Sequence, residues 1–88
     1  MEIRMDILTV VMEGAAGPTQ IMYKANLSWN LVTQHLGVLV GLGVLLENKI
    51  KNKYTYQLTE RGISVLRSYR LVVEKVNAAD QSGMQAFR

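Results

Sequence analysis

The chain has 88 residues, of which 49% are hydrophobic, and no cysteine. This length suits one small domain, and the lack of cysteine excludes a disulfide framework and a thiolate metal site. The formal net charge is +3, but residues 44–70 hold six Lys and Arg side chains against two Glu. A basic block of this kind indicates a surface that faces a polyanion, although a solvated charged face is the common alternative.

Two features of the chain argue against export and against a membrane partner. Glu2 and Asp6 stand where a secretory signal would be basic. The longest uncharged run made of glycine and aliphatic residues alone, residues 36–46, is well short of the roughly 20 residues that span a bilayer. We therefore expect a cytoplasmic protein, and one whose small core is completed by self-association.

Residues 2–13 are predicted to form an amphipathic helix, and residues 18–25 a short second one. The first helix ends at the segment GAAGP. Pro18 suits the first position of the second helix, because no intrahelical partner is needed for an N–H there. A tight turn at residues 26–27 follows. The predicted inward face of the first helix consists of Ile3, Ile7, Leu8 and Val11.

Residues 28–42 are predicted to form a third helix, with Ser28 as its N-cap. At about 100° per residue, the inward side holds Val32, His35, Leu36, Leu39, Leu42 and Gly43, and the outward side holds Asn30, Thr33, Gln34, Gly37 and Gly41. His35 is therefore expected to be packed and hydrogen-bonded rather than a metal ligand. Trp29 is expected to cover the edge of the core, with stacking on a DNA backbone as the alternative.

Residues 44–47 and 54–58 are predicted to be two strands of a hairpin whose tip is NKIKNK. Thr59 is expected to cap a last helix over residues 60–78, and residues 79–88 lack a period and are expected to form a flexible tail. The last helix carries a heptad seam, Leu66, Tyr69, Val73 and Val76. The predicted organisation is thus a domain over 1–58, a coiled-coil helix over 59–78 and a tail over 79–88.

This order of elements predicts an α+β winged helix-turn-helix, with three helices, a two-stranded wing and a C-terminal dimerisation helix. Asn30, Thr33 and Gln34 would then reach base edges in the major groove, since Asn and Gln can pair with adenine; the alternative is a solvated face. Lys49, Lys51 and Lys53, spaced two apart, are expected to project the same way and to contact phosphates. The alternative for the lysines is that they protect an exposed strand edge.

Three stretches, TQIMYKANLSW, TQHLGVLVGLGVL and YQLTERG, resemble the small archaeal winged-helix proteins, which include 10-kDa chromatin proteins and regulators. The resemblance covers residues 3 to about 76. It implies duplex DNA binding by a homodimer joined through an antiparallel coiled coil of the last helix. By position, it places Lys24 near a phosphate. The residues that it places in or beside the major groove are Ser28, Asn30, Thr33, Gln34 and Gly37, and those that it places on the wing are Lys49, Lys51, Asn52 and Lys53. Gly37 departs from the Lys or Arg that such helices often carry, and the last helix is shorter than the family's.

The predicted function is double-stranded DNA binding, as a transcriptional regulator or a nucleoid-associated chromatin protein. The alternative is a winged-helix module that binds another protein and no DNA. We expect no enzymatic activity, because the sequence holds no paired carboxylates and no nucleophile with a base. No metal and no cofactor are expected either, since there is only one histidine and no cysteine.

Overall fold

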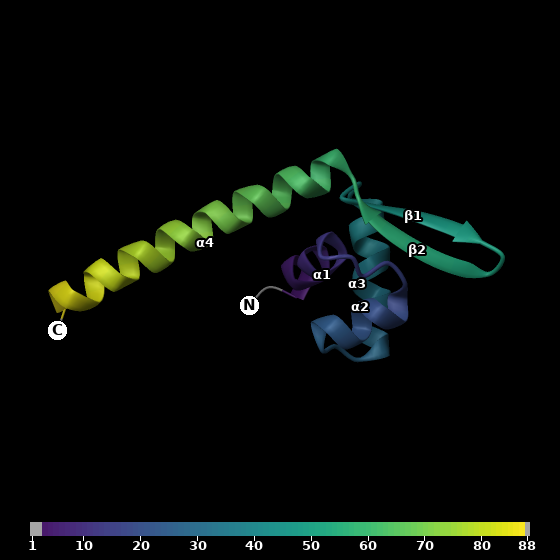
Figure 1. Cartoon of the computed structure of the whole chain (residues 1–88), viewed down its shortest axis with the longest axis horizontal. Helices are drawn as coiled ribbons and strands as arrows, with labels where there is room; N and C mark the ends of the chain where they lie inside the picture. Colours follow the sequence, from purple (N-terminus) through teal and green to yellow (C-terminus); the bar gives the residue numbers. More distant parts are fainter. Residues whose placement is uncertain (1–2, 88) are drawn as a thin grey trace.

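The computed structural model describes residues 3–87, with side chains described for residues 3–74. The elements are α1 (Ile3–Met12), α2 (Pro18–Ala25), α3 (Trp29–Gly41), β1 (Leu45–Ile50), β2 (Lys53–Leu58) and α4 (Glu60–Phe87). Helices α1–α3 form a cluster, from which the β1–β2 hairpin and α4 extend in opposite directions (Figure 1). The molecule therefore measures 57 × 26 × 20 Å. This arrangement confirms the predicted α+β winged helix-turn-helix architecture.

The core lies where α1 meets α2, α3, the base of the hairpin and the start of α4. Its fully buried side chains are Ile7, Leu8, Ile21, Val32, Leu39, Leu45 and Leu66. The predicted inward faces of the first and third helices are confirmed at Ile7, Leu8, Val11, Val32, Leu36 and Leu39. Ile3 and His35 are half-buried, whereas Leu42 and Gly43 are exposed. The Leu42 side chain, 51% exposed, lines a cavity.

The helix boundaries follow from local hydrogen bonding, largely as predicted. Ser28 caps α3, since its Oγ accepts a hydrogen bond from the Leu31 N–H at 3.2 Å. Asn26 ends α2 in the left-handed conformation, with φ of 57°, which Asn tolerates better than most residues. Gly43 has φ of +76°, and its N–H donates to the Val40 carbonyl oxygen at 3.0 Å. The tight turn after α2 and the end of α3 thus lie where the sequence predicts them.

The wing, defined as residues 45–58, is an antiparallel hairpin in which Leu45 pairs with Leu58 at the base and Ile50 with Lys53 at the tip. Lys51 and Asn52 connect the strands, and both have positive φ, 50° and 65°. Two consecutive residues of this kind are typical of the type I′ turn, whose twist matches that of the strands. The Tyr56 N–H donates to the Ala16 carbonyl oxygen at 2.9 Å. The base of the wing is therefore tied to the loop between α1 and α2.

The start of α4 is fastened to the turn between α3 and β1. Thr59 Oγ1 accepts a hydrogen bond from the Gly62 N–H at 3.0 Å and donates one to the Gly43 carbonyl oxygen at 2.6 Å. The predicted N-cap is thus confirmed. A Cβ atom on Gly62 would overlap the carbonyl oxygen of Val44, so this close approach of α4 to the backbone requires glycine.

Helix α4 continues to Phe87, so the predicted end near residue 78 is wrong, and so is the separation of residues 79–87 from the helix; residue 88 of the predicted tail lies outside the described residues. The sequence NAADQSGMQAF has no apolar period, but it is rich in residues with good intrinsic helix propensity. Without an apolar period this segment has no face to pack against the core, but its intrinsic helix propensity is unaffected and is enough to continue the helix. Within the described residues, no helix is both long enough and apolar enough to cross a membrane.

Candidate nucleic-acid interface

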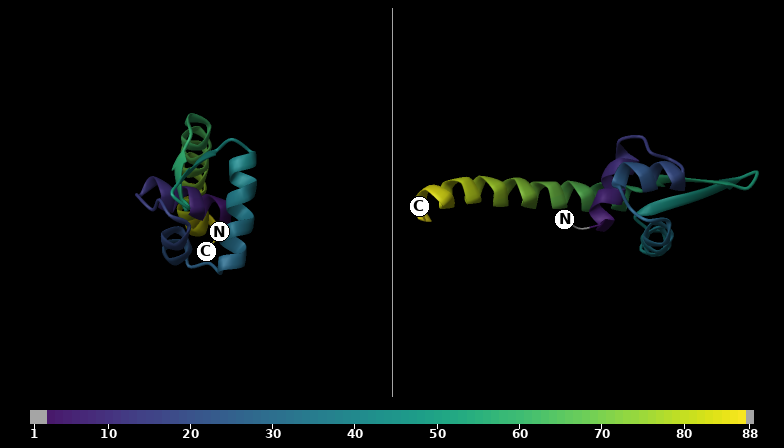
Figure 2. Two further views of the ribbon diagram at one scale, coloured as in Figure 1. Left: turned by 90° about the vertical axis from the view of Figure 1, so that its right-hand side faces the viewer. Right: turned by 90° about the horizontal axis from the view of Figure 1, so that it is seen from below.

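The outward side of α3 is an exposed, uncharged polar surface. Asn30, Thr33, Gln34 and Gly37 are all exposed, and α3 lies at the edge of the helical cluster, seen almost end-on in the right-hand view of Figure 2. Thr33 Oγ1 donates to the Asn30 carbonyl oxygen at 3.1 Å, which leaves its oxygen lone pairs available. Within residues 3–74, the side-chain amides of Asn30 and Gln34 have no hydrogen-bond partner. Both amides are therefore available to donate to and accept from a ligand.

Gly37 and Gly41 continue this side of α3 toward its C-terminal end. A Cβ atom at either position would meet nothing within 4 Å, so packing inside the chain does not require these glycines. The helix also contains no Asp, Glu, Lys or Arg. Here α3 presents a smooth surface with no charge, against which another backbone can come close.

A groove of about 310 Å³ separates α3 from the wing. Trp29, Thr33 and Gly37 line its helical side, and Glu47 and Tyr54 line its wing side. The Trp29 side chain is 48% exposed and lines this groove beside the buried Leu36 and Tyr56, so both of its expected roles, covering the core edge and stacking on a DNA backbone, stay predictions. Trp29, Thr33 and Gly37 follow one another at intervals of four residues, and this helical spacing already places Trp29 on the outward face.

A carboxylate is held on the wing side of this groove. The Tyr56 hydroxyl donates to Glu47 Oε2 at 2.7 Å. Burial of the phenol, together with its hydrogen bond to the Glu47 carboxylate, raises the pKa of Tyr56 above its usual value. The phenol remains a neutral donor, and the carboxylate can accept a hydrogen bond from a base amino group while repelling a phosphate.

The basic residues of the wing are divided between its two faces. In an antiparallel pair, directly opposed residues share a face, so Lys49 lies with Tyr54 and Lys53 lies with Ile50. Because the two pairs are adjacent, their faces are opposite. The prediction that Lys49, Lys51 and Lys53 project the same way is therefore wrong: the positive-φ turn at residues 51–52 interrupts the alternation that the prediction assumed.

The basic side chains are otherwise available. Lys49 Nζ lies 5.4 Å from the centroid of the Tyr54 ring, a cation–π distance. Lys24, Lys51 and Lys53 are exposed, and within residues 3–74 they make no ion pair. Asn52 is exposed in the turn, and Ser28 is exposed beside α3 but already engaged as its cap.

The predicted dimer seam on the last helix does not form one exposed stripe. Leu66 is 1% exposed and belongs to the core of the single chain, so its assignment to an interface is wrong. Tyr69 and Val73 are half-buried and line a groove with Asp6 and Thr9 of α1. Val76 lies outside the residues whose side chains are described. The heptad spacing identified an apolar stripe correctly, but α1 covers much of it.

Three other apolar side chains of α4 are exposed instead. Leu71 is 53% exposed and Val72 is 59% exposed, and Ile63 near the start of the helix is exposed as well. No signal in the heptad spacing separates these residues from the covered ones, since spacing alone does not say which side of the helix α1 occupies.

The sequence matches the model of the winged helix-turn-helix family over residues 1–77. It is 32% identical over 77 residues to the uncharacterized protein MJ0287 of Methanocaldococcus jannaschii, a match that covers 88% of this chain and 75% of that protein.

Several solved structures share the fold, and two of them come from Sulfolobus solfataricus. The DNA-binding protein Sso10a-2 from Sulfolobus solfataricus is 17% identical with a TM-score of 0.73, and the match covers 100% of this chain and 98% of that one. The transcriptional regulator BldR from the same organism is 14% identical with a TM-score of 0.80, covering 91% of this chain. This chain spans 60% of BldR, so the larger regulator contains further segments.

Proposed function

Because this chain belongs to the winged helix-turn-helix family, we propose that it binds double-stranded DNA, as a transcriptional regulator or a chromatin-associated protein. The observation that carries the proposal is the outward side of α3, where the amides of Asn30 and Gln34 are exposed and without partners in the described part of the chain. In this arrangement α3 enters the major groove and the wing follows the adjacent phosphates. The role places the protein in the cytoplasm, at the nucleoid.

The proposed contacts divide into those that read sequence and those that supply affinity. Asn30, Thr33 and Gln34 reach base edges, while Lys24 and Lys49 neutralise phosphates. The solved structures that share the fold support DNA binding as such, since Sso10a-2 is a DNA-binding protein and BldR is a transcriptional regulator. A binding role of this kind, rather than catalysis, is also what the family favours.

Two chains are proposed to associate through α4 into a homodimer. Helix α4 extends well beyond the helical cluster (Figure 1), and its exposed Leu71 and Val72 would lose contact with water against a second copy. A twofold pairing presents two α3 helices to one duplex. Tyr69 and Val73 flank this contact rather than form its centre, because α1 covers part of each.

The test of DNA binding is fluorescence anisotropy with random and genomic duplexes, repeated across salt concentrations. We expect binding at low salt and a steep linear fall of log affinity with log salt, because each neutralised phosphate releases counterions. No binding at low salt would contradict the proposal and support the second candidate function, a module for protein contact. The exposed Leu46 and Ile50, which share one face of β1, favour that candidate.

A further inference from the structure

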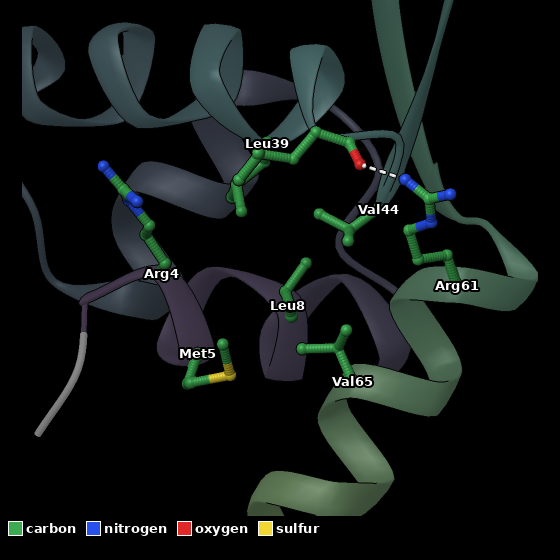
Figure 3. A pocket seen from close by; sticks show the side chains of 8 residues that line it. Arg4, Met5, Leu8, Leu39, Val44, Arg61 and Val65 are labelled. Carbon is green, nitrogen blue, oxygen red and sulfur yellow. Dashed lines mark hydrogen bonds between the residues drawn. The ribbon is translucent and has the colours of Figure 1, made fainter.

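A second site lies away from the surface proposed to meet DNA. It is a cavity of about 520 Å³ between α1, the C-terminal end of α3 and the first turns of α4 (Figure 3). Its volume lies within the range of small-molecule sites, roughly 300–1,000 Å³. Met5 and Leu8 of α1, Leu39 of α3 and Val65 of α4 supply apolar walls, and Leu8 and Leu39 are almost fully buried.

The polar groups of this cavity are two arginines. Among its described lining residues there is no Asp or Glu, so Arg4 and Arg61 leave the cavity positively charged. Arg61 Nη1 donates to the Leu42 carbonyl oxygen at 3.1 Å, and Arg4 Nε donates to His35 Nδ1 at 3.4 Å. These are their only side-chain hydrogen bonds within the described side chains. A guanidinium carries five N–H donors, so donors remain on both residues.

Figure 3 shows how the two guanidinium groups differ. That of Arg61 lies beside Val44, next to the apolar side chains, whereas that of Arg4 is directed away from Leu8 and Val65. Arg61 is therefore the residue that an anion inside the cavity would meet. Arg4 adds positive charge at the opposite end of the cavity.

We propose that this cavity binds a small organic acid with an aromatic or other bulky apolar body. Its carboxylate accepts hydrogen bonds from Arg61, whose planar fork matches the two carboxylate oxygens, and its body lies against Leu8, Leu39 and Val65. Inorganic phosphate fits less well, because the apolar walls leave its remaining oxygens without donors. A neutral apolar compound would leave the guanidinium donors unused.

The occupied cavity would connect the end of α3 to α1 and to α4. If the proposed DNA binding is correct, the acid acts as an effector, because it favours whichever position of α3 best closes the cavity. Ligand binding itself does not rest on the proposed function. The experiment below is therefore carried out without DNA.

The test uses 2-naphthoate, with 2-naphthamide as a neutral compound of the same shape. Amide chemical shifts of the full chain are followed during titration with each compound. We expect the naphthoate to perturb the amide chemical shifts of Leu8, Leu39 and Val65. It should also bind at least about tenfold more tightly than the naphthamide, because one charge-assisted hydrogen bond usually strengthens binding by about that factor. Equal affinities, shifts confined to the wing or the end of α4, or no binding at millimolar concentration would each overturn the proposal.

Variants locate the carboxylate. Arg61→Gln removes the charge but keeps a donor for the Leu42 carbonyl, and it should weaken naphthoate binding at least about tenfold while leaving naphthamide unchanged. Arg61→Lys should restore part of the affinity. Arg67→Gln is the matched control, since it makes the same charge change on the same helix outside this cavity. If Arg67→Gln lowers naphthoate affinity as much as Arg61→Gln does, the attraction comes from the net charge of the protein and the proposed site is overturned. If Arg61→Gln unfolds, the comparison of naphthoate with naphthamide on the parent protein still decides whether the cavity prefers a carboxylate.

Discussion

Lys49 and Lys53 lie on opposite faces of the wing, although both are within two residues of its turn. Lys49 is opposite Tyr54 and Lys53 is opposite Ile50 in adjacent pairs of the hairpin. Glu47 and Tyr54, which line the groove beside α3, share the face of Lys49. The face of Lys49 is therefore the one continuous with the outward side of α3, and the face of Lys53 is turned away from it.

Lys49→Ala and Lys53→Ala are accordingly expected to differ in their effect on DNA binding. Lys49→Ala should lower the slope of log affinity against log salt by about 0.9, the loss of one phosphate contact, equally on all duplexes. Lys53→Ala, the matched control, should leave the slope nearly unchanged. Fluorescence anisotropy across salt measures both. Equal losses in the two variants would mean that the duplex reaches both faces of the wing tip.

Gln34→Ala is expected to change sequence preference rather than overall affinity. The exposed amide of Gln34 can pair with one base, so its loss should alter discrimination at one position by about 1–3 kcal/mol without changing the salt slope. Gln57→Ala, which removes the same amide from an exposed position of β2, is the control. Binding measured on a randomised duplex library provides the test. Unaltered preferences in Gln34→Ala would contradict direct readout by this residue.

Gly62→Ala is expected to destabilise the fold, while Gly37→Ala stabilises it. An added Cβ at residue 62 would overlap the Val44 carbonyl oxygen, and such overpacking costs about 1–3 kcal/mol, more than the helix propensity that alanine adds. At residue 37 the Cβ meets nothing within 4 Å, so the only effect is the higher helix propensity of alanine, which should raise the free energy of unfolding by about 0.5–1 kcal/mol. Urea denaturation gives both free energies of unfolding. Two stabilised variants would show that α4 can move away from Val44 at little cost.

Leu71→Glu combined with Val72→Glu is expected to convert a dimer into a monomer. Both side chains are exposed in the single chain, so the change should disturb the pairing of two α4 helices without disturbing the core. Leu46→Glu combined with Ile50→Glu makes the same change at exposed positions of the wing and should leave the dimer intact. Sedimentation velocity at micromolar concentration measures the outcome. A parent protein that sediments as a monomer at high micromolar concentration would refute the dimer.

Tyr56 is expected to make stability fall in alkaline solution. Burial and the hydrogen bond to Glu47 raise the pKa of Tyr56 in the folded state, so the neutral phenol is favoured by folding. The contribution of the neutral phenol to the free energy of unfolding is complete below about pH 10, the pKa of tyrosine in the unfolded chain. It is lost as the pH rises from that value toward the higher pKa of the folded state. The difference in unfolding free energy between the parent and Tyr56→Phe should therefore shrink from pH 9 to pH 11. Tyr23→Phe, which removes the hydroxyl of an exposed side chain, is the control.

Local signals are sufficient to predict the starts of α2, α3 and α4 and the end of α3. Pro18, Ser28, Gly43 and Thr59 act through their own backbone or through a hydrogen bond to a residue close in sequence, so their effects can be read from the sequence. The end of α4 was missed because the prediction required an apolar period where intrinsic propensity was enough.

The candidate site was only partly predictable, for reasons of geometry between elements. Which residues face outward on α3 follows from helical periodicity, and Asn30 and Gln34 are exposed as expected. The faces of Lys49 and Lys53 depend on the number of residues in the turn, and the burial of Leu66 depends on where α1 packs. The local sequence pattern shows neither the length of the turn nor the side of α4 on which α1 packs.

The hairpin register also says how this protein could diverge in evolution. The wing is held at its base by the bond from Tyr56 to Ala16, so a rung, one residue in each strand, could be gained near the tip without altering the helical core. A rung inserted between the Lys49–Tyr54 and Ile50–Lys53 pairs would rotate the outer pair by half a turn, bringing Lys53 to the face that Lys49 now occupies. An insertion or deletion of one rung would thus redistribute charge between the two faces of the wing without any substitution. Relatives of this chain could therefore differ in the charge of the face beside α3 through hairpin length alone.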